Sequence, residues 1–128
     1  MVYDTVEDLL LDASFSVTPF DGIILETTIH NNECIVGILY NPDKYFEFYQ
    51  LFLAKEVENG YRLMEVSYKI ACSNLQYGTT WIPAEGPCEV ALQYIDDEME
   101  IDDTRQDHET KLFSNGRTVW IGLGPKDA

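Results

Sequence analysis

Basic side chains are scarce in this sequence. Of its 128 residues, 8 are lysine or arginine and 23 are aspartate or glutamate, which gives a formal net charge of −15 at pH 7. A surface of this charge repels the phosphates of DNA and RNA and the headgroups of anionic membranes. We therefore expect no direct nucleic-acid partner and no membrane partner. A basic protein, a metal cation or a cationic ligand suits the charge better.

Long hydrophobic runs are also missing. No apolar segment approaches the roughly 20 residues that a helix needs to span a bilayer, and the first residues lack the basic start of a secretory signal peptide. We therefore expect a cytoplasmic location. Apolar residues still make up 45% of the chain, with 8 tyrosines and 6 phenylalanines, which is typical of a folded protein. At this length we expect a single domain, residues 1–128.

Cysteines are few and odd in number. Cys34, Cys72 and Cys88 show no Cys-x-x-Cys spacing, whereas a small oxidised scaffold normally carries more cysteines in an even number. We therefore expect reduced thiols that are partly buried. A zinc site built from them with His30 or His108 has no support in the spacing. We expect no metal and no cofactor.

Catalytic motifs are missing as well. The sequence contains no G-x-S-x-G, no G-x-G-x-x-G, no phosphate-binding loop and no H-E-x-x-H. Carboxylate pairs are so numerous that the choice of any two as an acid and a base would be arbitrary. We therefore expect a protein that is not an enzyme and has no catalytic residues.

A short helix is expected near the N-terminus. Asp4 followed by Glu7 resembles a helix N-cap with its reciprocal partner. The apolar residues that then recur at the spacing of one helix face are Val6, Leu9, Leu10 and Ala13. The pattern predicts an amphipathic helix over residues 5–13 that covers part of a core.

Turn signals at short intervals predict strands for the rest of the chain. Asn59-Gly60 and Asn115-Gly116 are the strongest of them, because a type I′ hairpin turn needs positive φ at both central residues. Apolar and polar residues alternate over residues 61–70, as in a half-buried strand. The sequence therefore predicts a mainly β (α+β) fold: a curved antiparallel meander of about seven to nine strands with the short N-terminal helix against one face.

Two segments fit either a strand or a helix. Residues 42–57 have Pro42 where a helix can begin, but their dense aromatics favour a strand. In residues 88–101 the apolar residues fit the spacing of a helix face and also the alternation of a strand. A helix there would end in acidic residues, and negative charge is unfavourable at a helix C-terminus. We therefore predict strands in both segments, the second over residues 88–95.

One stretch concentrates the acidic charge. Its members are Asp96, Asp97, Glu98, Glu100, Asp102, Asp103, Asp107 and Glu109, with Arg105 as the single base among them. The stretch lacks the ligand spacing of a calcium loop. It fits either a solvated loop or a landing surface for the lysines and arginines of a protein partner.

Aromatic residues could anchor such a contact. Trp81 lies in a loop-rich stretch, so we expect either a core residue or an exposed anchor there, with Tyr77 beside it. The leading hypothesis is then an acidic inhibitor that covers the active surface of a basic partner, most clearly a bacterial immunity protein or antitoxin held against a nuclease-type toxin. The alternatives are a phage-encoded nucleic-acid mimic that inhibits host defence, a small-molecule-binding β-barrel whose cavity the aromatics of residues 45–53 would line, and acidity that serves solubility alone.

Overall fold

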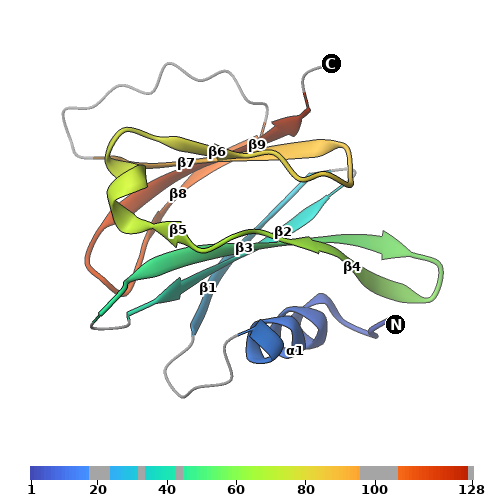
Figure 1. The fold of residues 1–128 in the computed structure, drawn as a ribbon. Helices are drawn as coiled ribbons and strands as arrows, with labels where there is room; N and C mark the ends of the chain where they lie inside the picture. The colour runs from blue at the N-terminus through green and yellow to red at the C-terminus, as the bar shows by residue number, and fades with distance from the viewer. Residues whose placement is uncertain (18–23, 32–33, 43–44, 96–106, 127–128) are drawn as a thin grey trace.

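In a computed structural model, the described residues form two antiparallel β-sheets, one α-helix and one short 3-10 helix (Figure 1). The structure describes residues 1–17, 24–31, 34–42, 45–95 and 107–126. The prediction of a mainly β protein with a short N-terminal helix is confirmed, since nine strands are found. None of the described helices is long and apolar enough to cross a membrane.

The first sheet follows the chain as a meander. Its strands are β1 (Ile24–His30), β2 (Ile35–Asn41), β3 (Phe48–Val57) and β4 (Gly60–Val66), with the two-residue β5 (Ile70–Ala71) paired to β3 beyond β4. The short 3-10 helix η1 (Cys72–Gln76) leads from this sheet to the second.

The second sheet departs from a simple meander. It contains β6 (Thr79–Trp81), β7 (Cys88–Ile95), β8 (Asp107–Leu112) and β9 (Thr118–Pro125) in the order β6-β7-β9-β8. After β7, the next strand along the chain, β8, therefore lies at the edge of the sheet, and the last strand, β9, pairs between β7 and β8. Neither sheet closes on itself, so the closed barrel considered from the sequence is not formed.

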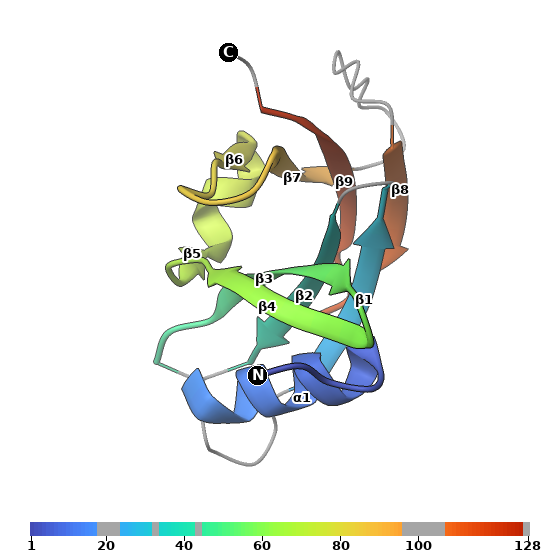
Figure 2. The same ribbon diagram turned by 90° about the vertical axis from the view of Figure 1, so that its right-hand side faces the viewer.

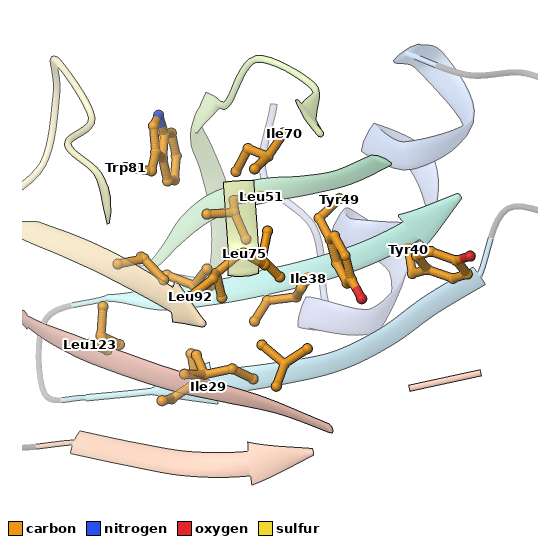
Figure 3. Close-up of a cluster of buried hydrophobic side chains, with 14 of the residues drawn as sticks. Ile29, Ile38, Tyr40, Tyr49, Leu51, Ile70, Leu75, Trp81, Leu92 and Leu123 are labelled. Atoms are coloured by element: carbon orange, nitrogen blue, oxygen red, sulfur yellow. The ribbon is translucent and has the colours of Figure 1, made fainter. Parts of the chain in front are cut away.

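The sheets stack face to face, and the helix α1 (Val6–Val17) lies on the outer face of the first sheet (Figures 1 and 2). One apolar cluster fills the space between the sheets, where Leu51, Leu92 and Ile121 are among the fully buried members (Figure 3). A second cluster lies between α1 and the first sheet and includes Leu9 and Phe52.

Strand β3 belongs to both clusters. Tyr49 and Leu51 face the second sheet, whereas Phe48 and Phe52 face the helix. A strand that is buried on both faces carries apolar residues on both sides, which explains why its sequence lacks clean alternation. The strand predicted over residues 88–95 is confirmed by β7, and the strand predicted within residues 42–57 is confirmed for residues 48–57 by β3. The aromatics of β3 belong to the two cores, whereas Tyr45 and Phe46, which were also expected to line a cavity, are exposed.

The N-cap of α1 is Thr5 and not Asp4. The Thr5 hydroxyl accepts a hydrogen bond from the backbone N–H of Asp8 at 3.1 Å, which is the capping contact between the N-cap and the third helical residue. The helix runs to Val17, four residues beyond the predicted end. The predicted apolar face is confirmed, since Leu9 and Leu10 are fully buried.

Both Asn-Gly pairs lie at hairpins, but neither forms the predicted type I′ turn with Asn and Gly as its two central residues. Gly60 pairs with Val57 and begins β4, so the central residues of the first turn are Glu58 and Asn59, and only Asn59 of these two has positive φ. In the β8–β9 hairpin, positive φ is found at Gly116. There the N–H of Gly116 donates to the carbonyl of Phe113 at 2.9 Å, as in a three-residue loop that ends in a left-handed glycine. The Asn115 side chain accepts from the N–H of Arg117 at 2.9 Å, which stabilises this loop.

The expectation of reduced cysteines is wrong for two of the three. Cys34 and Cys88 form a disulfide, and Cys72 is free. Cys34 comes just before β2 and Cys88 begins β7, so the bond joins the two sheets. The pairing depends on how the sheets stack, and the 54-residue separation gives no local signal of it.

Candidate functional site

The structure describes only the end of the predicted acidic stretch. Asp107 and Glu109 lie on β8, and not in a loop as the charge pattern suggested. The other predicted partner-binding acids, Asp96, Asp97, Glu98, Glu100, Asp102 and Asp103, lie outside the described residues.

Asp107 and Glu109 lie on the face of β8 that is directed toward the first sheet. Their partners on β9 are Leu123 and Ile121, which belong to the core between the sheets, and residues directly opposite in a sheet share a face. β8 is an edge strand that lies beside β1 (Figure 2). The two carboxylates therefore lie along the seam where the edges of the sheets meet.

Side-chain hydrogen bonds join the two edges at this seam. The Thr27 hydroxyl of β1 donates to a carboxylate oxygen of Glu109 at 3.4 Å. The Ser114 hydroxyl, in the β8–β9 loop, donates to Glu26, which occupies an irregular position in the β1–β2 register. The seam thus brings Glu26 to the same edge as Glu109, although nothing in the sequence pattern singled out Glu26.

The two aromatic residues predicted as contact anchors differ in their exposure to solvent. Tyr77 follows η1 and is 90% exposed, as a contact residue must be. Trp81 is 5% exposed and belongs to the core between the sheets. The prediction of Trp81 as an exposed anchor is wrong, because β6 pairs Trp81 with Val90 and so directs both side chains inward.

The described part of the chain contains six lysines and arginines. In the described part of the chain, no lysine or arginine forms a salt bridge with a described carboxylate; these bases are Lys55, Arg62, Lys69, Lys111, Arg117 and Lys126. Two of them lie over the faces of aromatic rings. Arg117 lies 4.0 Å from the ring centroid of Tyr94 and Lys69 lies 4.9 Å from that of Phe48.

A cluster of tyrosine hydroxyls closes one end of the core. The Tyr49 and Tyr94 hydroxyls are 3.0 Å apart, and the Asn115 amide donates to Tyr49 at 2.9 Å. Tyr40, at the same end (Figure 3), donates to Glu47 at 2.7 Å. Burial, first of all, raises the pKa of Tyr40, Tyr49 and Tyr94. These hydroxyls therefore stay protonated at neutral pH, and the cluster supplies neutral hydrogen bonds that hold the two sheets together.

The remaining thiol lies near this cluster. Burial raises the pKa of Cys72, so the protonated thiol predominates, which is the less nucleophilic form. Among the residues that the structure describes, no three histidine, cysteine, aspartate or glutamate side chains are grouped so that they could hold a metal ion.

The fold and surface define an acidic protein of two open, antiparallel sheets with one helix packed outside. Comparisons with protein-family models, with curated proteins and with solved structures gave no match to this chain. Its function is therefore argued from its own charge and geometry.

Proposed function

We propose that this protein is an acidic binding protein that inhibits a basic protein partner by covering its cationic active surface. The observation that carries the proposal is a net charge of −15, with 23 acidic against 8 basic side chains. Uncompensated charge of one sign accelerates association with a surface of the opposite sign, and it specifies which partners are accepted.

The acidic stretch from Asp96 to Glu109 is the proposed contact surface. Lysines and arginines that hold nucleic-acid phosphates in a nuclease would instead meet these carboxylates. Tyr77, with 90% of its surface exposed, is the aromatic residue available for a desolvated contact. The seam residues Glu26 and Glu109 extend the same charge onto the edge of the first sheet.

An immunity protein or antitoxin against a nuclease-type toxin fits this mechanism best. A phage-encoded mimic of nucleic acid would use the same electrostatics against a host defence protein, and the identity of the captured partner distinguishes the two. We propose a cytoplasmic location for either one. The Cys34–Cys88 disulfide argues against this location, because stable disulfides are rare in the cytosol.

The proposal is tested by capture of the partner. The tagged protein is used to capture proteins from its own cells at low salt, and the column is then washed at high salt. We expect one basic protein to remain in stoichiometric amount, and we expect its enzymatic activity to fall to the background at a 1:1 ratio of added protein. Basic proteins that all leave at high salt, or a retained protein whose activity is unchanged, would refute the proposal.

A further inference from the structure

A pocket of about 260 Å³ opens beside the disulfide, away from the acidic seam. It lies between β3, β4 and the loop that precedes β7. The residues that line it are Cys34, Leu53, Ala54, Lys55, Met64, Gly86 and Pro87. Apart from Lys55, the lining side chains are apolar or belong to the disulfide.

The loop that forms one wall of the pocket is held from two sides. A carboxylate oxygen of Glu65 accepts the N–H of Ala84 at 3.0 Å, and the other oxygen accepts the N–H of Glu85 at 3.1 Å. On the opposite side, the ammonium group of Lys126 donates to the carbonyl of Pro83 at 2.7 Å. Because these bonds fix the backbone, the wall is present before any ligand binds, as in most small-molecule sites.

Gly86 lets this loop approach β3 closely. Its φ of +87° lies in the left-handed region, and an added Cβ would come within 2.7 Å of a methyl group of Leu53. The pairing of β3 with β4 shifts register between Leu53 and Ala54. Met64 is the unpaired residue at this shift, and it contributes its side chain to the pocket.

Two cations lie at this pocket in a chain that has few. Lys55 lines it and pairs directly across the hairpin with Arg62. The guanidinium of Arg62 contacts the sulfur of Met64 at 3.5 Å, so its charge lies next to the lining. Neither residue forms a salt bridge with any carboxylate of the described residues. Two adjacent cations that pair with no described carboxylate, beside a pocket whose lining side chains are mostly apolar, are complementary to an apolar molecule that carries one negative charge.

We infer that this pocket binds a small apolar monoanion, such as a medium-chain carboxylate. The apolar body would lie against Leu53, Met64 and the disulfide, and the carboxylate would face Lys55 with Arg62 beside it. An apolar cavity of about 150 Å³ accepts benzene, so a pocket of this volume has room for roughly ten non-hydrogen atoms. This site is independent of the proposed inhibitor surface, because it selects a ligand of the opposite charge.

Titration with octanoate, which has the expected size and charge, tests the inference. Binding is followed by isotope-edited NMR on the intact chain, with octanamide as the uncharged probe of equal length. We expect saturable 1:1 binding of octanoate, with the largest shifts at Met64 and Gly86. Octanamide should bind about tenfold more weakly, the factor expected for the loss of one charge-assisted hydrogen bond.

Matched variants identify the cation. Lys55→Gln should weaken octanoate binding about tenfold and abolish the preference over octanamide, whereas Lys55→Arg should keep it. Lys69→Gln removes the same charge at a lysine that lies over Phe48 instead, and it should bind octanoate like the wild type. Failure of octanoate to saturate, shifts located elsewhere, or equal effects of Lys55→Gln and Lys69→Gln would overturn the inference. None of these results depends on the protein partner.

Discussion

The disulfide between Cys34 and Cys88 should be the largest single contribution to stability that one chemical change can remove. It closes a loop of 54 residues, and the chain-entropy relation gives about 4 kcal/mol for a loop of that length at 25 °C. Both cysteines are buried, at 2% and 0% exposure. The bond also joins the two sheets, which otherwise meet through side chains. Its loss should therefore loosen the packing between them.

The assay compares urea unfolding of the wild type with that of Cys34→Ala/Cys88→Ala. We expect the free energy of unfolding to fall by about 4 kcal/mol. With a denaturant dependence of about 2 kcal/mol per molar urea, the midpoint should move down by about 2 M. Cys72→Ala is the matched control, since Cys72 is free and half-buried. It should lower the free energy by no more than about 1 kcal/mol.

A thiol count makes the result decisive. The denatured, unreduced protein should react with one equivalent of a thiol reagent, at Cys72, and with three after reduction. Three reactive thiols before reduction, or a double variant as stable as the Cys72→Ala control, would refute this account of how the sheets are joined.

Two further predictions concern the backbone and the hydroxyl cluster. Gly60→Ala should lower the free energy of unfolding in urea by about 2–3 kcal/mol, because the new Cβ would lie 2.2 Å from the carbonyl oxygen of Tyr3. Gly116→Ala is the control: Gly116 has φ +79° and no atom within 4 Å of the added Cβ, so this change should lower the free energy by only about 1 kcal/mol. Equal losses for the two variants would contradict the contact with Tyr3. Stability should begin to fall near pH 9, where Cys72 ionises in the unfolded state while burial keeps its pKa higher in the folded state. Above about pH 10, the ordinary pKa of tyrosine, each buried tyrosine should add a fall of up to about 1.4 kcal/mol per pH unit, since burial keeps the pKa of Tyr49 above that value in the folded state. Unfolding measured from pH 8 to 11 should show a smaller slope for Tyr49→Phe, and an unchanged slope would contradict it.

Local patterns predicted most of the fold. The stripe of Leu9 and Leu10 located the helix, and the glycines at 60 and 116 located two hairpins. The strand at 48–57 was predicted from its dense aromatics. Its sequence pattern was ambiguous because a strand that is buried on both faces carries apolar residues on both sides and shows no clean alternation. The order β6-β7-β9-β8 could not be predicted, because no local signal tells whether a strand joins the edge of a sheet or enters between two others.

The candidate sites depended more on contacts between distant residues. Trp81 was ambiguous because a three-residue strand is too short to show alternation, and its pairing with Val90 decides its direction. The disulfide, the seam and the pocket all join segments far apart in the chain. The pair Lys55 and Arg62 was not predicted, because a turn centred on Asn59-Gly60 would pair Lys55 with Met64. The loop residues are Glu58 and Asn59, so Lys55 pairs with Arg62 instead.

The association rate of the captured partner tests the central claim most directly. It is measured as a function of ionic strength for the wild type and for two variants that remove four charges each. One variant changes Asp96, Asp97, Asp102 and Asp103 to Asn, and the other changes Glu7, Glu56, Glu58 and Glu85, all exposed, to Gln. We predict an association rate that falls steeply with salt and is lowered about tenfold by the first variant at low salt but far less by the second. Equal effects of both variants, or a rate that is independent of salt, would contradict the proposal that the acidic stretch recognises the partner.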